Sequence, residues 1–302
     1  MDFSLLQELC AVPAPSGSEY MLTAWLNDYL QKNMHSWKQT PKVHQFQDCL
    51  IWVFGKPRTA VFTHLDSVGF SVGYNNELLS IGAPNYDNGV VLIGKDSQGY
   101  IETIIEVHED EYIFANFDRI IERGTKLTFK PIWSETEDTI QCCYMDNRGG
   151  LWVTLKLCET LQNGIIVFSC YEEHGGGTVG FLADFIQKQY NIQQALICDI
   201  TWSTDGVQAG KGVAISLRDR LIPRQIYLDK IVALAQKSGI AFQLEVESAG
   251  GSDGSEIQRS PLLMDWCFIG APEDNVHCYN EILNKQDLIG MLKLYEFLMN
   301  EL

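Results

Sequence analysis

One apolar segment limits what this chain can fold into more than any other feature. Residues 164–170 (GIIVFSC) form an unbroken apolar run, which is the pattern of a strand covered on both faces. Helical patterns flank this run over residues 149–162 and 178–189, and a second apolar run follows at residues 195–199. Because helices alternate with buried strands, the sequence predicts an α/β fold with a mostly parallel sheet and helices on both faces.

The middle of the chain has a different pattern. Between residues 67 and 140, short β-like runs are separated by Gly, Asn and Asp turns, and no convincing helix is predicted. Before this segment, a helix is predicted over residues 16–33, with Ser16 and Glu19 in its capping box. The sequence therefore predicts an α/β domain made of residues 1–66 and 141–302, with a small all-β domain inserted at residues 67–140.

Charge and hydropathy exclude several classes of function. The formal net charge of -17 argues against nucleic-acid binding, because phosphate contacts need a basic surface. No apolar run approaches the roughly 20 residues that a bilayer span requires. The first residues also lack the pattern of a secretion signal. We therefore expect a cytoplasmic protein with no membrane or nucleic-acid partner, and we interpret its nine cysteines as reduced core thiols.

Five short motifs carry chemically useful side chains. Four of them follow or end an apolar strand, and the carboxyl ends of strands are where ligands bind in open α/β sheets. Each motif alone is a weak signal, but the set supplies two imidazoles and several carboxylates, which suits two divalent ions of borderline softness. The motifs are His64-Leu65-Asp66, Asp146 with the residues that follow it, Glu172-Glu173, Asp199-Ile200-Thr201 and His277.

The residue types in these motifs suit different tasks. His64 and Asp66 share a face of an extended chain, so Asp66 can accept a hydrogen bond from the second ring nitrogen of a metal-binding His64. Asp146 opens a helix, where a carboxylate can bridge two ions. Adjacent glutamates point in different directions, so one of Glu172 and Glu173 can bind metal while the other acts as a general base.

The order of these motifs resembles the metallopeptidase family forty-two, which includes glutamyl, deblocking and tetrahedral-assembly aminopeptidases. The likeness runs nearly end to end. It rests on Pro15-Ser16-Gly17, residues 63–70 (THLDSVGF), Tyr171-Glu172-Glu173, Asp199-Ile200-Thr201, residues 250–253 (GGSD), and His277 with Glu281. The resemblance implies a zinc-aminopeptidase-like, phosphorylase/hydrolase-like fold, cleavage of the N-terminal bond of short peptides, and a homo-oligomer.

The same resemblance implies a role for each site residue. One divalent ion would be held by His64, Asp146 and Asp199, and a second by Asp146, Glu173 and His277. Glu172 would be the general base, and Asp66 would orient His64. The expected cofactors are two zinc or cobalt ions per chain, with manganese as a further option, since such a pair activates a shared water.

The chain departs from the family pattern in two places. Asn147 stands where the family usually has a second Asp, and residues 174–177 (HGGG) replace the usual Val-Gly-Leu-Arg. All the implied metal ligands are present, so the departures bear on substrate preference and assembly. Arg218, Arg220 and Ser252 are candidates for the substrate pocket, although surface charge or turn chemistry also accounts for them.

Two other classes of function stay open at this point. The acylase and carboxypeptidase relatives use a similar order of ligands, but they place an accessory domain in the interval that here lies between Asp199 and His277. That interval is too short to hold such a domain as well as the remaining strands, whereas residues 67–140 have room for the β-rich insert. A non-catalytic binding protein on the same fold is the other alternative, because fold does not imply function.

Overall fold

The computed structural model of the protein describes residues 2–108 and 112–302, and its largest element is an eleven-stranded sheet. The strand order is β1-β2-β12-β3-β13-β16-β17-β11-β10, while β14 pairs with β16 and carries β15 on its other side. The strands are β1 (Lys42–Phe46), β2 (Cys49–Phe54), β3 (Ala60–His64), β10 (Ser134–Glu135), β11 (Thr139–Cys142), β12 (Gly164–Ser169), β13 (Gln194–Trp202), β14 (Val213–Arg218), β15 (Phe242–Val246), β16 (Asp265–Asp274) and β17 (Glu281–Asn284).

The sheet is mixed, so the prediction of a mostly parallel sheet holds only in part. Parallel pairing joins the central strands β12, β3, β13 and β16, and also joins β14 to β15. The remaining pairs are antiparallel. The physical reason is clearest at β1 and β2, where a two-residue connection at 47–48 is too short for the crossover that parallel strands need.

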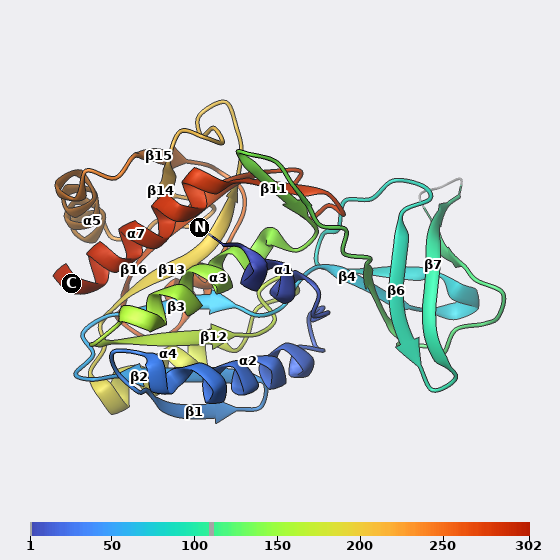
Figure 1. Ribbon diagram of the computed structural model, residues 1–302, viewed down its shortest axis with the longest axis horizontal. Coiled ribbons are helices and arrows are strands. Elements are labelled where there is room, and N and C mark those ends of the chain that lie inside the picture. Colours follow the sequence, from blue (N-terminus) through green and yellow to red (C-terminus); the bar gives the residue numbers. More distant parts are fainter. Residues whose placement is uncertain (1, 109–111) are drawn as a thin grey trace.

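Helices cover both faces of this sheet, as predicted. His44 and Phe46 on β1 contact Phe185 of α4, whereas Trp52 on β2 contacts Trp37, which follows α2. His44 pairs with Ile51, so Trp52 points to the opposite face from the residues that meet α4. Figure 1 shows α2, α3 and α7 in front of the sheet, with α4 behind it.

The helices are α1 (Ser4–Cys10), α2 (Tyr20–Asn33), α3 (Met145–Thr160), α4 (Val179–Tyr190), α5 (Gln225–Ser238), α6 (Asp253–Arg259) and α7 (Lys285–Glu301). Among the described residues, no helix is long and apolar enough to cross a membrane.

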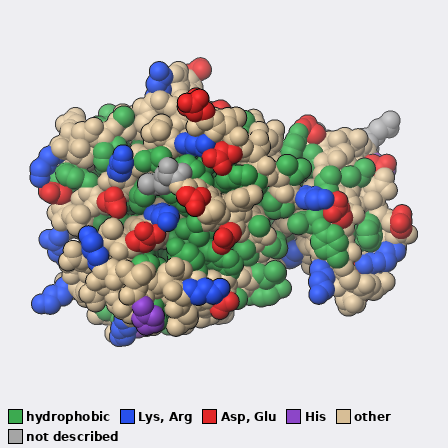
Figure 2. All heavy atoms as spheres, in the orientation of Figure 1, with side chains coloured by type: hydrophobic (Ala, Val, Ile, Leu, Met, Phe, Trp, Pro, Cys, Tyr) green, Lys and Arg blue, Asp and Glu red, His purple; other side chains and the backbone are tan. Residues whose placement is uncertain are grey.

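A second, six-stranded antiparallel sheet is built from the segment between β3 and α3. Its order is β5-β4-β9-β6-β7-β8, and it forms the smaller lobe in Figures 1 and 2. Figure 2 shows acidic and basic side chains interspersed over the visible face of both lobes. The last two strands of the segment, β10 and β11, return to the large sheet. The strands of the smaller lobe are β4 (Gly69–Val72), β5 (Leu78–Ile81), β6 (Val91–Asp96), β7 (Gly99–Val107), β8 (Ile113–Asn116) and β9 (Lys126–Phe129). The domain boundaries given above remain a prediction.

The structure differs from the sequence prediction at several elements. Helix α2 begins at Tyr20 rather than at residue 16, and no side chain caps it. The Ser16 hydroxyl instead donates to Asp66 Oδ2 at 2.5 Å, in the segment just after β3. Several elements are not predicted from the sequence, and one of them is β16, although its residues 266–269 (WCFI) are apolar and buried. The others include α1, α6, β1, β14, β15 and β17.

Candidate metal centre

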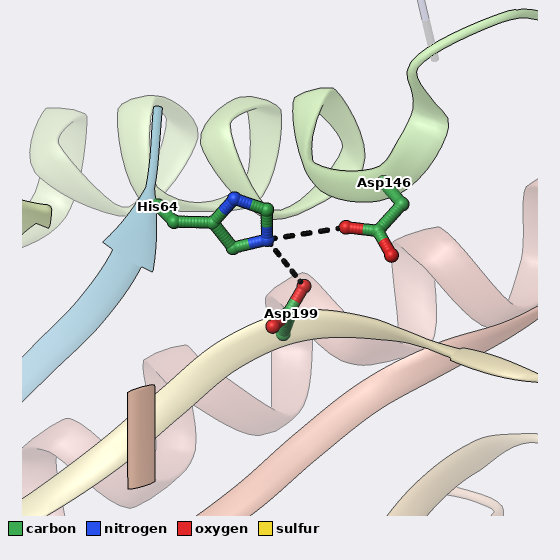
Figure 3. A group of neighbouring side chains, drawn as sticks. All are labelled: His64, Asp146 and Asp199. Atoms are coloured by element: carbon green, nitrogen blue, oxygen red, sulfur yellow. Dashed lines mark hydrogen bonds and ion pairs between the residues drawn. The ribbon is translucent and has the colours of Figure 1, made fainter. Parts of the chain in front are cut away.

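The first group of site residues forms around His64, the last residue of β3. Its Nε2 atom lies 3.1 Å from Asp146 Oδ1 and 3.3 Å from Asp199 Oδ1. Asp146 is the second residue of α3, and Asp199 lies on β13, next to β3 in the sheet (Figure 3). The other ring nitrogen of His64, Nδ1, lies 3.1 Å from the Asp66 carbonyl oxygen and 3.6 Å from Asp66 Oδ1. These contacts place the Nδ1 proton toward Asp66 and leave Nε2 facing two carboxylates.

A second group shares Asp146 with the first. His277 Nε2 lies 3.1 Å from Glu173 Oε2 and 3.5 Å from Asp146 Oδ2, so the two oxygens of Asp146 face different imidazoles. In each group the potential ligand atoms all lie within 4.8 Å of one another. The five predicted metal ligands are therefore brought together in two groups with one shared carboxylate. Neither group contains a cysteine.

Left-handed backbone marks three positions in this site. Tyr144 has a φ of 69° two residues before Asp146, Tyr171 has a φ of 67° just before Glu172, and His277 itself has a φ of 62°. Non-glycine residues adopt this region at a cost and persist there only when the surrounding structure fixes them. Such strain clusters at functional sites, and here the three positions adjoin Asp146 and Glu172 or are a member of a ligand group themselves.

The carboxylates and imidazoles perturb one another strongly. Burial raises the pKa of Glu173 to about 7, and the charge of Asp146 adds to this rise. Burial acts to lower the pKa of His277, but the charge of Glu173 and the hydrogen bond with Asp146 outweigh it and raise that pKa to about 12. Burial also raises the pKa of Glu172 well above its usual range. The site is therefore a strongly negative environment that stabilises positive charge on its imidazoles.

The residues present fit divalent cations. Imidazole nitrogen and carboxylate oxygen are the ligands that zinc and related ions take in proteins, and catalytic zinc sites use three protein ligands. Each group here offers three such side chains. Glu173 Oε1 is buried and has no hydrogen-bond partner among the described residues, so it has unused capacity to bind a cation. Both imidazoles also place their other nitrogen against a carbonyl oxygen, the arrangement typical of metal-binding histidines.

Glu172 belongs to neither group, although it lines the same cavity of about 440 Å³. Its backbone amide donates to Asp66 Oδ1, and the amide of Glu173 donates to Asp66 Oδ2, both at 3.0 Å. Asp66 is fully buried and also accepts from Ser16. Its carboxylate therefore fixes the loop that carries both glutamates, while its carbonyl is the nearer partner of His64.

The backbone around Asp146 is held by residues that the metal groups do not include. Glu281 Oε2 accepts from the amide of Met145 at 2.5 Å and from that of Asp146 at 3.4 Å. The side-chain nitrogen of Asn147, Nδ2, donates to Thr63 Oγ1 and to the Cys198 carbonyl, and its Oδ1 accepts from the backbone amide of Gly150. An aspartate could not donate these two hydrogen bonds, so the departure at Asn147 has a structural role in this chain.

A loop from the smaller lobe supports His277, a contact that the sequence analysis does not predict. The Ala83 carbonyl lies 3.2 Å from His277 Nδ1. The Asn85 amide donates to the His277 carbonyl at 3.0 Å, and Asn85 Nδ2 donates to the Val276 carbonyl at 2.8 Å. The available sequence signal is the turn-forming stretch at residues 82–85 (GAPN), which does not reveal its distant partner.

This contact leads to a prediction. Asn85→Ala removes the side-chain hydrogen bond to the Val276 carbonyl, next to His277, and keeps the backbone bond to His277. We expect it to weaken divalent-metal binding by about tenfold, the low end of the 10–100-fold that residues supporting a metal ligand typically contribute to affinity. The measurement is competition with a fluorescent chelator. Asn88→Ala is the matched control, since Asn88 lies in the same loop but contacts Val107. Equal metal affinities for the two variants would contradict the supporting role.

Of the three residues considered for the substrate pocket, the structure places one in the cavity lining. That residue is Arg220. Ser252 does not line the cavity and caps α6 through a hydrogen bond from Gly254, which is the turn role considered above. Arg218 is also absent from the lining and donates to the Asp219 carbonyl.

The sequence profile of the M42 glutamyl aminopeptidase family matches residues 95–294. A protein of Acetivibrio thermocellus that is provisionally named an aminopeptidase is 29% identical over 169 residues. That match covers 52% of this chain and 50% of the relative, so the chain spans about half the length of the curated relative in the alignment.

Solved structures share the fold over nearly the full chain. The aminopeptidase APDkam598 from the archaeon Desulfurococcus kamchatkensis superimposes with a TM-score of 0.87 at 20% identity, covering 99% of this chain and 94% of that one. The TET1 peptidase of Pyrococcus horikoshii, which can assemble into a tetrahedron or a large octahedral shell, gives 0.80 at 21% identity, with 99% of each chain covered. At these identities the likeness establishes the mixed α/β fold.

Proposed function

The chain belongs to the M42 glutamyl aminopeptidase family, and on this premise we propose that it is an aminopeptidase that hydrolyses the first peptide bond of short peptides. Membership of this metallopeptidase family implies divalent-metal cofactors. The observation that carries the proposal is the pair of ligand groups that share Asp146 beside an uncommitted glutamate, Glu172.

We propose that the site binds two ions per chain, zinc or cobalt, with manganese as a further option. His64, Asp146 and Asp199 would hold one ion, and Asp146, Glu173 and His277 the other. When bound, such ions supply Lewis acidity that lowers the pKa of a water molecule and polarises the scissile carbonyl. The imidazole and carboxylate ligands favour ions of borderline softness over magnesium or calcium, which prefer oxygen alone.

Within this proposal, Glu172 moves the proton. Its carboxylate takes a proton from the attacking water and returns that proton to the nitrogen of the departing peptide, so the proton balance closes within one turnover. Burial raises the pKa of Glu172, which favours a carboxylate that can hold the proton between the two steps. Asp66 would act as a positioning residue, because it fixes the amides of Glu172 and Glu173 and contacts His64.

We also propose an oligomeric state and partners for this chain. The assembly described for the Pyrococcus horikoshii peptidase supports a homo-oligomer for this chain, with short peptides as its other partners. The cytoplasm as its location, and the absence of nucleic-acid and membrane partners, stay predictions from the sequence.

The test compares two substrate classes with metal-supplemented protein. Aminoacyl-nitroanilides carry a free amino group, whereas N-acylated amino acids are the substrates of the acylase-type alternative. We expect cleavage of the first class and none of the second. Cleavage of N-acylated amino acids alone would support the acylase alternative, and failure to cleave either class would support a binding protein.

A further inference from the structure

The cavity that contains the metal groups continues beyond them along one face of the large sheet. Besides the metal ligands, its lining includes three carboxylates that no part of the proposed mechanism uses. These are Asp219, Glu245 and Glu247, and Ser216 and Thr201 lie on the same lining.

Strand register explains why these residues face the same space as the metal ligands. Asp199 and Thr201 stand two residues apart on β13, so their side chains point to the same face, about 7 Å apart along the strand. Thr201 Oγ1 donates to Glu245 Oε1 at 2.5 Å. The Glu245 carboxylate, carried by β15, is thus held next to Thr201. Thr201 stands two residues along β13 from Asp199, a proposed metal ligand.

A second strand brings a hydroxyl to the same place. Ser216 on β14 pairs with Glu245 on β15, and on its other side with Phe268 on β16. Directly paired residues point to the same face of a sheet. The floor of the cavity is therefore formed by neighbouring side chains of three strands, with a carboxylate and a hydroxyl next to an aromatic ring.

Two side chains in this region have polar atoms without partners. Asp219 is 8% exposed and Ser216 is 2% exposed. Asp219 Oδ2 and Ser216 Oγ are buried and have no hydrogen-bond partner among the described residues. A buried polar atom without a partner is costly, so this end of the cavity is suited to a ligand that donates hydrogen bonds.

The charge of the lining favours a cation. Among the described residues, none of Asp219, Glu245 and Glu247 has a basic nitrogen within 4.0 Å of its carboxylate. Apart from His277 of the second ligand group, Arg220 is the basic residue of the lining, and it is exposed, with Nη2 near Gly251. Three carboxylates against one exposed guanidinium make this region acidic.

An aromatic side chain completes the pocket. Phe268 lines it and is 6% exposed. Lysine and arginine bury their methylene groups against apolar surface while their charged end finds polar partners.

We propose that the acidic pocket formed by Asp219, Glu245, Glu247, Ser216 and Phe268 binds the side chain of the substrate's first residue and selects lysine and arginine. This inference rests on the proposed aminopeptidase function. The stem of the substrate side chain lies against Phe268, and its cationic end lies between Glu245 and Asp219. A glutamyl side chain would instead meet carboxylates of like charge.

The test compares two substrates that share a four-carbon side-chain stem and differ in the terminal ammonium group. We expect kcat/KM for lysyl-p-nitroanilide to exceed that for norleucyl-p-nitroanilide, which lacks the charge, by about 10- to 100-fold, the usual contribution of a hydrogen bond to a charged group. Glu245→Gln keeps an acceptor for Thr201 but removes the charge. Asp219→Asn likewise keeps an acceptor for the amide of Leu221. Each variant is expected to lower the lysine-to-norleucine ratio about tenfold.

Asp229→Asn is the charge-matched control, because Asp229 is exposed on α5 and does not line the cavity. It should leave the ratio unchanged. Equal cleavage of lysine and norleucine by the wild type, or a preference for glutamate, would overturn the inference and leave the proposed function standing. Equal losses for both substrates in Glu245→Gln would also overturn it, because the carboxylate would then act on the common α-ammonium group. Failure to cleave any aminoacyl substrate would refute the aminopeptidase function itself.

Discussion

Replacing Glu172 by glutamine is expected to lower kcat by about 10²–10⁴-fold, the usual contribution of a general base, while the protein retains its metal ions. Glutamine has nearly the shape of glutamate but cannot take a proton from water. Glu172 lies outside both ligand groups, so its replacement removes no ligand. The backbone amide of residue 172 keeps its hydrogen bond to Asp66, which preserves the loop.

The neighbouring glutamate provides the matched control for this prediction. Glu173→Gln makes the same chemical change one residue away, but it alters a member of the second ligand group. We expect Glu173→Gln to lose metal and Glu172→Gln to keep it. Steady-state kinetics and elemental analysis of the two purified variants separate these outcomes. An active Glu172→Gln enzyme would show that another residue moves the proton.

Replacing Asp146 by alanine is expected to remove metal and activity together. Asp146 is the shared member of the two groups, with one oxygen 3.1 Å from His64 Nε2 and the other 3.5 Å from His277 Nε2. Without it, each group keeps only two of its three side chains, below the three protein ligands of a typical catalytic site. Activity should then fall to background, with metal content well below that of the wild type.

Asp199→Ala distinguishes a bridge from an ordinary ligand. Asp199 belongs to the first group alone, so this variant should keep the ion of the second group. Elemental analysis after dialysis is the measurement, and circular dichroism verifies that both variants are folded. If Asp146→Ala and Asp199→Ala retained the same amount of metal, Asp146 would not serve both ions.

The five proposed ligands could be picked out from the sequence because of where they stand in the chain, and whether they bind metal stays a prediction. His64 ends an apolar strand, Asp199 lies within another, and Glu173 follows a third, so the parallel centre of the sheet brings them to one edge. Their residue types already indicate divalent-metal chemistry. The prediction was weaker where a residue has two competing partners, as at Ser16, whose hydroxyl serves Asp66 instead of capping α2.

Local hydrophobic periodicity and short motifs, which are read within a few residues, were enough to predict the alternation of strands and helices, the family, and the residues that gather in the candidate metal centre. The mixed strand order, the support of the His277 segment by Asn85, and the pocket where Thr201, Ser216 and Glu245 meet are visible in the folded chain alone. The reason is physical: strand register and loop contacts join residues far apart in the chain, and no local pattern specifies which partner a strand or loop will meet.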